Sequence, residues 1–212
     1  MPLRLVTPPT VEPLTITDVQ AHIRVDDLSG EALAIGLFIQ ALRERAEAET
    51  HRALITQTWE LSMDKFPIPQ VFGYTGLAPI YPRHFRGEIE LPKGQLQAIT
   101  SITYIDVLGV QQTLDPATYT IDNAQEPALL VPAYGCAWPG CRGDINGVKI
   151  RYTAGYGATA ATIPAAVRAW MLMNIASLYE NRESTVVGPR IVMAELTTIC
   201  DSLLMPFYLP VF

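Results

Sequence analysis

The chain has 212 residues, of which 49% are hydrophobic and 17% are charged, so it has enough apolar sequence to form a folded globular protein. Its formal net charge of -6 and pI near 5.0 argue against a protein that mainly grips phosphates, because nucleic-acid-binding proteins concentrate Lys and Arg on one face. The three cysteines are an odd set that suits reduced thiols, and the proline-rich start holds no apolar run of signal-peptide length, so we expect a cytosolic product.

Two helices are predicted near the start of the chain. Residues 1–14 are interrupted by prolines and should be extended. Thr17 and Gln20 have the spacing of a capping box, which predicts a short helix over residues 17–24. Ser29 is a suitable N-cap for a longer helix that reaches about residue 50. We expect that helix to bury its apolar positions and expose its polar ones. The apolar set is Leu33, Leu37, Phe38, Ala41 and Ala48, and the polar set is Gln40, Arg43, Glu44 and Glu47.

The composition then changes to β-branched and aromatic residues separated by Pro and Gly. Apolar and polar residues alternate from Ile55 to Met63, which predicts a strand with one buried face. The further predicted strands cover residues 87–91, 98–106, 110–114, 118–122, 128–132 and 148–154, with a hairpin at residues 107–109. Residues 67–86 and 133–147 are predicted to be long loops, which are commonly contact surfaces or mobile segments.

Residues 162–183 are predicted to form the most apolar helix of the chain. Thr162 can cap its first turn, and Pro164 lacks a donor that this turn would leave unpaired. One stripe contains Val167, Met171, Asn174 and Leu178, and the stripe beside it contains Trp170, Met173 and Ser177. The apolar run is too short and too often interrupted for a membrane span. We therefore expect the rest of the chain, or other copies of it, to cover this helix.

The chain should end with a loop over residues 186–190, a helix over residues 193–204 and an extended tail over residues 205–212. Two prolines disfavour a helix or a central strand in the tail. Its apolar residues are Phe207, Tyr208, Leu209, Val211 and Phe212. Two alternatives remain for this segment: it folds back on its own core, or it docks into a groove of another subunit or partner.

No set of residues has the pattern of an active site. Cys136 and Cys141 are spaced too widely for a two-residue zinc knuckle, and no second Cys or His pair lies near them in the sequence. His51 and Glu49 do not face each other on a helix. Gly155 and Gly157 precede a helix but lack the Lys and Ser/Thr of a phosphate-binding loop. We expect no catalytic residue, no metal and no cofactor.

Together these elements predict an α+β protein. It should contain a small bundle of about four helices, two from each end of the chain, with a large inserted antiparallel β-rich block and an extended C-terminal tail. The predicted domains are a helical core from residues 1–54 and 160–204, a β-rich subdomain over residues 55–159, and the tail over residues 205–212.

A set of segments, in order along nearly the whole chain, resembles one known family. These segments are PTVEPLTITDVQAHIRVD (residues 9–26), RALITQTWEL (52–61), LDPATY (114–119), VPAYG (131–135) followed by Trp138 and Pro139, IRYTAGYG (150–157), IPAAVR (163–168) and YENRE (179–183). The chain thereby resembles the head-tail connector, or head-completion adaptor, proteins of long-tailed bacteriophages.

The resemblance implies a structural virion protein without enzymatic activity. Such an adaptor forms a homo-oligomeric ring of about a dozen copies below the portal protein and extends the DNA channel toward the stopper or tail-completion protein. It would lie in the neck between capsid and tail after assembly in the host cytoplasm, with no membrane involved. DNA would pass without sequence-specific binding, and an acidic channel wall would repel its phosphates.

The resemblance also suggests where contacts form. The tail would bind the portal or a neighbouring protomer through Phe207, Tyr208, Leu209 and Phe212. The ring contact would involve Trp170, Met173, Glu180 and Arg182, while Val167, Met171 and Leu178 pack on the helix over residues 33–48. The alternative from another functional class is a cytosolic ligand- or protein-binding module. In that case the β-rich block would recognise its partner through residues 133–147, and the helices would be a scaffold.

Overall fold

The structure is a computed structural model that describes residues 2–68, 87–180 and 200–209. The chain divides into two compact units. Residues 9–56 and 155–212 form the first, here called the helical unit, and residues 1–8 and 57–154 form the second, here called the sheet unit. The predicted α+β class is confirmed.

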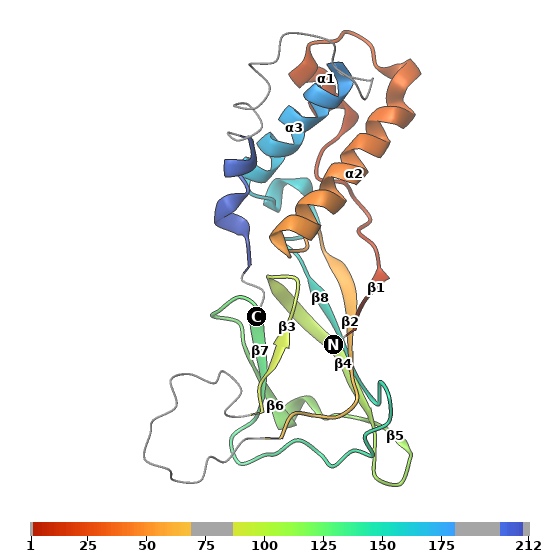
Figure 1. The fold of residues 1–212 in the computed structure, drawn as a ribbon, viewed down its shortest axis with the longest axis vertical. Helices are drawn as coiled ribbons and strands as arrows, with labels where there is room; N and C mark the ends of the chain where they lie inside the picture. Colours follow the sequence, from red (N-terminus) through yellow and green to blue (C-terminus); the bar gives the residue numbers. More distant parts are fainter. Residues whose placement is uncertain (1, 69–86, 181–199, 210–212) are drawn as a thin grey trace, which may run out of the picture. The chain divides into compact units, whose positions relative to one another are not determined.

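Three α-helices of the helical unit lie wholly within the described residues and pack together (Figure 1). They are α1 (Ile16–Ile23), α2 (Ala32–Thr50) and α3 (Ala165–Glu180). Short 3-10 turns lie at η1 (Ser29–Glu31), η3 (Ala160–Thr162) and η4 (Met205–Phe207). Residues 200–202 are also helical and belong to the predicted last helix; the rest of that helix and the loop over residues 186–190 lie outside the described residues.

The capping box of α1 lies two residues earlier than predicted. Thr15 is the N-cap: the Asp18 amide donates to Thr15 Oγ1 at 3.1 Å, and the Thr15 amide donates to Asp18 Oδ2 at 2.8 Å. An acidic residue at the third helical position satisfies the free amide and also favours the positive end of the helix. Gln20, which was expected to close the box with Thr17, instead donates to the Asp26 carbonyl at 2.7 Å.

The predicted buried face of α2 is wrong except at Phe38, which is partly buried and packs against the core. Leu33 and Leu37 are 81% and 57% exposed. The buried residues are instead Ile35, Ile39, Leu42, Arg43, Ala46, Glu47 and Thr50. Both stripes have helical spacing, and contact with α3 decides between them. The α-helix also begins at Ala32 and not at Ser29, because η1 precedes it.

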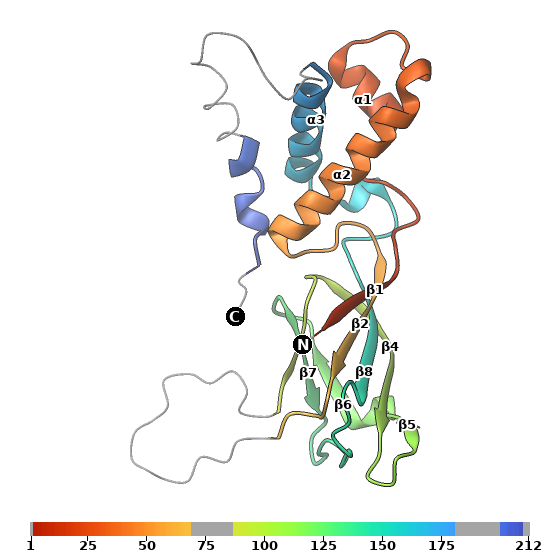
Figure 2. The ribbon, with the colours of Figure 1, turned by 45° about the vertical axis from the view of Figure 1, so that its right-hand side comes forward.

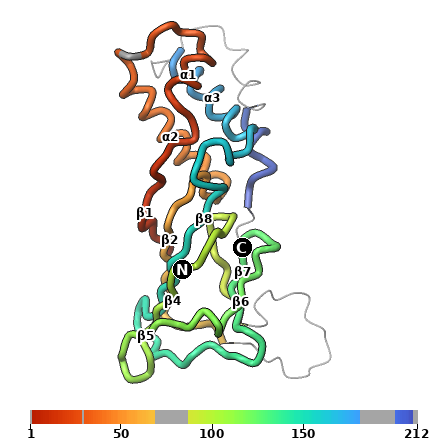
Figure 3. The backbone as a smooth tube through the Cα atoms, turned by 180° about the vertical axis from the view of Figure 1, so that it is seen from behind, coloured from red at the N-terminus to blue at the C-terminus, as the bar shows by residue number. Residues whose placement is uncertain are grey.

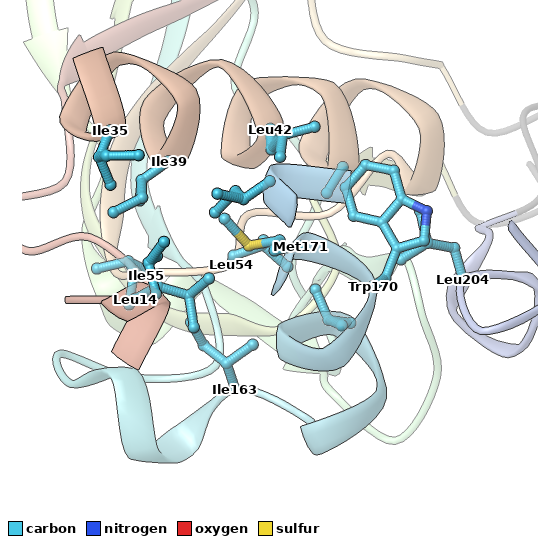
Figure 4. Close-up of a cluster of buried hydrophobic side chains, with 14 of the residues drawn as sticks. Leu14, Ile35, Ile39, Leu42, Leu54, Ile55, Ile163, Trp170, Met171 and Leu204 are labelled. Carbon is cyan, nitrogen blue, oxygen red and sulfur yellow. The ribbon is translucent and has the colours of Figure 1, made fainter. Parts of the chain in front are cut away.

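The core of the helical unit gathers residues from distant parts of the sequence (Figure 4). Trp170 of α3 is fully buried, and its Nε1 donates to Asp201 Oδ1 at 3.3 Å. Leu204, near the end of the chain, is also fully buried in this cluster. The other labelled members are Leu14, Ile35, Ile39, Leu42, Leu54, Ile55, Ile163 and Met171. Burial of each large side chain contributes about 1.5–3 kcal/mol, so this cluster dominates the stability of the unit.

The described residues of the sheet unit form two antiparallel sheets (Figure 2). The five-stranded sheet has the order β1 (Leu3–Thr7), β2 (Gln57–Met63), β8 (Val148–Ala154), β4 (Leu96–Ile105) and β5 (Gln111–Thr113). The three-stranded sheet has the order β3 (Ile89–Leu91), β7 (Ala128–Pro132) and β6 (Tyr119–Asp122). Apart from β1, each strand lies within a few residues of a predicted one.

The five-stranded sheet buries one face at its central strand β8. On β8 the buried residues Val148, Ile150 and Tyr152 alternate with exposed Lys149 and Arg151. This is the pattern of an antiparallel strand with one face on the core. The Tyr152 hydroxyl donates to the carbonyl of Pro92, the residue that follows β3, at 3.0 Å. The buried side of the five-stranded sheet therefore contacts the connection that joins β3 to β4.

Strand β1 was not predicted, and it moves residues 1–8 from the expected helical core to the sheet unit. It runs antiparallel to β2, with Leu3 opposite Leu61 and Leu5 opposite Trp59 (Figure 3). The segment is short and flanked by prolines, so its own alternation is too brief to indicate a strand. Pairing with β2 supplies the backbone hydrogen bonds that it lacks alone.

Two local expectations near α3 and the tail also differ. The Thr162 hydroxyl does not cap α3 but donates to the Thr159 carbonyl at 2.7 Å, within η3. The tail begins with the turn η4 over Met205–Phe207 and is not extended there. Pro206 fits this turn because a proline at the first positions of a helix costs no hydrogen bond.

Candidate interaction surfaces

The described part of the tail packs on its own unit. The Leu209 amide donates to the Thr50 carbonyl at 3.1 Å, and Arg52 Nε donates to the Phe207 carbonyl at 2.6 Å. Leu209 is only 8% exposed. The fold-back alternative is therefore confirmed for these residues, and Leu209 is not available to a partner in this arrangement. Phe212 lies outside the described residues.

Tyr208 is the exposed aromatic residue of the described part of the tail, at 42% exposure, and Met205 is 66% exposed. Partial burial raises the pKa of its hydroxyl, and the carboxylates of Glu49 and Asp201 raise it further. Glu49 also accepts a hydrogen bond from Arg45 Nε at 2.6 Å. The surface around Tyr208 thus combines an aromatic ring with charged groups, which suits a partner that offers both apolar and polar contacts.

The four residues predicted to form the ring contact, on and after α3, differ in whether the structure leaves them accessible. Trp170 is fully buried within the chain, so it cannot contact a neighbouring protomer and that assignment is wrong. Met173 is half-buried and Glu180 is exposed, which keeps both accessible, while Arg182 lies outside the described residues. Leu178, expected in the core, is 40% exposed. The buried side of α3 consists of Val167, Trp170, Met171 and Ile175.

The outer face of the five-stranded sheet is a surface that sequence reasoning missed. Arg4 of β1, Glu60 of β2, Arg151 of β8 and Ser101 of β4 occupy one row across four strands. Lys149 and Thr103 are paired in a neighbouring row. These residues line a hollow of about 730 Å³. Arg151 Nη2 donates to Glu60 Oε2 at 2.7 Å, so three cations share this face with one carboxylate that is already paired.

The only sequence signal for this surface is the alternation of Lys149 and Arg151 with apolar residues in β8. It identifies an exposed face on one strand. It does not say which residues of other strands lie beside them, because that depends on the register of pairing. Arg4 in particular comes from the strand that was not predicted.

The residues considered for chemistry are not brought together in the part of the chain that the structure describes. No group of three or more His, Cys, Asp or Glu residues there could hold a metal ion. Cys136, Cys141 and Cys200 are free thiols, and burial raises the pKa of Cys200. His51 ends α2 in a left-handed conformation, with φ of 56°. Among the described helices, none is long and apolar enough to cross a membrane.

Comparison with solved structures defines the class of fold. No protein-family model and no curated protein matches the sequence. A chain from the neck of an empty gene transfer agent (GTA) particle, computed with C6 symmetry, matches with a TM-score of 0.72 at 20% identity. A chain from the virion of a native GTA particle matches with a TM-score of 0.71 at 20% identity.

A third match is a chain from the neck of a native GTA particle computed with C12 symmetry, with a TM-score of 0.64 at 19% identity. In all three cases the match covers 100% of this chain and 98% of the other. The protein therefore shares its complete fold, both units included, with chains of virion necks.

Proposed function

We propose that this protein is a structural component of the neck of a phage-like virion, where it forms a homo-oligomeric ring. The observation that carries the proposal is the fold shared with the neck chains over 100% of this chain and 98% of theirs. A match of that extent includes the helical unit, the sheet unit and the order in which the chain passes between them. It does not come from one common subdomain that many unrelated proteins contain.

Within the neck, the protein acts as a head-tail adaptor without enzymatic activity. It binds below the portal protein and extends the DNA channel toward the stopper or tail-completion protein. The ordered segments that resemble the connector family support this role. The C6 and C12 symmetry of the neighbours' particles supports a ring, in which each copy uses two different surfaces to contact the next. The net charge of -6 suits a channel through which DNA slides.

The contact with the portal or a neighbouring protomer involves the exposed part of the tail surface. Tyr208 is its accessible aromatic residue, and Phe207 lies beside it, half-buried. Met173 and Glu180 of α3 contribute to the ring contact. Deletion of the whole tail is a poor test of this assignment, because Leu209 is part of the folded helical unit and its loss would destabilise the unit itself.

The ring is tested by co-expression with the portal protein encoded by the same genome. Mass photometry and negative-stain electron microscopy are applied to the protein alone, with its portal, and with the portal of an unrelated phage. We expect a ring of this protein on its own portal and none on the unrelated one. A species that stays monomeric under all three conditions would overturn the proposal and favour the binding-module alternative.

The same assay tests the tail surface. Tyr208→Ala should reduce the amount of protein bound to the portal by about tenfold, since an interface aromatic commonly contributes more than 1 kcal/mol. Tyr134→Ala is the matched control, because Tyr134 is a fully exposed tyrosine in the sheet unit. Equal binding of the two variants would remove Tyr208 from the contact without affecting the ring itself.

A further inference from the structure

The two sheets of the sheet unit carry opposite charge on the surfaces they present. The outer face of the five-stranded sheet holds Arg4, Lys149 and Arg151 around the hollow. Its one carboxylate, Glu60, is 14% exposed at the side chain and is neutralised by Arg151. Among the described residues, neither Arg4 nor Lys149 forms an ion pair. Two uncompensated cations therefore remain on a concave surface of a protein that is acidic as a whole.

The strands of the three-stranded sheet carry acidic side chains and no basic ones. Glu90 of β3 and Asp122 of β6 both lie opposite Leu129 of the central strand β7, so the two carboxylates share one face. Glu90 is partly exposed and stands between the buried residues Ile89 and Leu91, on the face that also carries Leu129, which is 9% exposed. The other carboxylates in this region are Glu88, Asp115 and Glu126. The three strands contain no Lys or Arg.

These two surfaces lie on different sheets of the same unit, so each copy carries both of them. A two-fold contact through either surface alone would bring like charges together, which disfavours a dimer of that kind. A head-to-tail contact would pair the basic surface of one copy with the acidic surface of the next. Repetition of such a contact by a rotation that closes generates a ring.

We propose that neighbouring protomers meet through these surfaces, with the basic face of the five-stranded sheet of one copy bound to the acidic three-stranded sheet of the next. This inference rests on the proposed ring and names the charged surfaces that form it. Arg4 and Lys149 supply the unpaired positive charge, and Glu88 and Glu90 supply the negative charge. Because such contacts are screened by ions, the ring loses stability as the salt concentration rises.

Charge reversal provides the test, in the assay with the portal described above. One variant carries Arg4→Glu and Lys149→Glu, which leaves the pair between Arg151 and Glu60 intact. The other carries Glu88→Lys and Glu90→Lys, which avoids Asp122 because that carboxylate accepts hydrogen bonds from its own turn. With each variant alone, the amount of assembled ring should fall at least about tenfold, because its two surfaces now carry charge of the same sign.

The two variants should assemble again when they are mixed, because each supplies the charge that the other lacks and they can alternate around the ring. A single chain with all four substitutions should also assemble. Lys65→Glu, an exposed residue of the sheet unit outside both surfaces, is the matched control and should assemble as wild type does. Circular dichroism at 222 nm and the thermal midpoint check that every variant folds.

A second measurement uses the wild-type ring and does not depend on variants. A zero-length carbodiimide joins Lys149 to Glu88 or Glu90 only where the two side chains touch. We expect this cross-link between copies in the assembled ring and not in the monomer.

Rings that form equally well with each variant alone, or that lack the cross-link, would overturn this inference and leave the proposed function standing. Absence of a wild-type ring would overturn both. If Arg4→Glu and Lys149→Glu spare the ring but weaken retention of duplex DNA in a gel shift, the basic face binds nucleic acid and the inference fails.

Discussion

The two units place an arginine-carboxylate cluster in opposite environments. In the helical unit Arg43 is 6% exposed; its Nε donates to Glu12 Oε2 at 2.8 Å and its Nη1 to Glu47 Oε2 at 3.2 Å. Glu47 also accepts from the Leu54 amide at 2.9 Å, so the cluster joins the N-terminal segment, α2 and the connection after it. In the sheet unit Arg151 is 46% exposed at the side chain and pairs with Glu60, whose side chain is 14% exposed.

The comparison shows that arginine and carboxylate side chains stabilise the fold where they are buried and are available for association where they are exposed. Burial lowers the pKa of Arg43, but the hydrogen bond to Glu12 and the charges of Glu47 and Glu44 outweigh it, and the pKa is raised. The folded state therefore depends on the carboxylates that pair with the buried arginine, because an unpaired buried charge is strongly destabilising. Exposed charges are solvated in the free protein, contribute little to its stability, and remain available to another molecule.

The largest effect should come from the apolar core. Trp170→Ala removes the largest fully buried side chain and should cost about 4 kcal/mol of unfolding free energy. Leu33→Ala is the matched control: Leu33 is 81% exposed and should cost less than about 0.5 kcal/mol. Urea unfolding followed by circular dichroism at 222 nm reports on the helical unit, which contains α1, α2 and α3. Similar losses for both variants would contradict the described burial.

An intermediate effect on stability is expected from a comparison of the arginine-carboxylate clusters of the two units. Arg43→Met should cost about 3 kcal/mol, because it leaves the buried carboxylate of Glu47 without its cation. Arg151→Met should cost less, about 1 kcal/mol, because Arg151 is 46% exposed at the side chain even though its partner Glu60 is 14% exposed. Chemical denaturation of both variants is the measurement. Equal costs would erase the contrast between the units.

The smallest effect concerns an exposed charge within the helical unit. Hydrogen bonds from Thr15 lower the pKa of Asp18 below its ordinary value of 3.8. The stabilisation is thus fully present above pH 3.8 and is lost as the pH falls through the lowered pKa. Asp18→Asn should cost about 0.5 kcal/mol of unfolding free energy at neutral pH. The difference in unfolding free energy between this variant and wild type should shrink as the pH falls below 3.8. Thermal unfolding across this pH range would show a constant difference if Asp18 were uncharged in the cap.

The strands of the sheet unit were largely predictable. β7 and β8 have the bounds that alternation and turn residues predicted, Ala128–Pro132 and Val148–Ala154. The hairpin at residues 107–109 was also predicted correctly: Asp106 Oδ1 accepts from the amides of Leu108 and Val110, both at 2.9 Å. These features depend on residues close together in the chain, so the local sequence contains the necessary information.

The faces of the helices were not predictable in the same way. On α2, Leu33 with Leu37 and Ile35 with Ile39 both have helical spacing, and α3 selects the second pair. On α3, apolar residues occur on every side, so the sequence does not show that Trp170 is buried and Leu178 is exposed. Periodicity identifies a helix, but only its neighbours decide which of two apolar stripes is covered.

For this protein the sequence by itself determined the fold class, the predicted strands and hairpin, and the ordered segments that resemble head-tail connector proteins. These follow from local periodicity, turn chemistry and chain order. Only the tertiary structure decided that β1 joins the sheet, that Leu209 closes on the helical unit, and that Arg4, Glu60 and Arg151 share one face. Each of these depends on contacts between residues far apart in the chain, whose register no local pattern specifies.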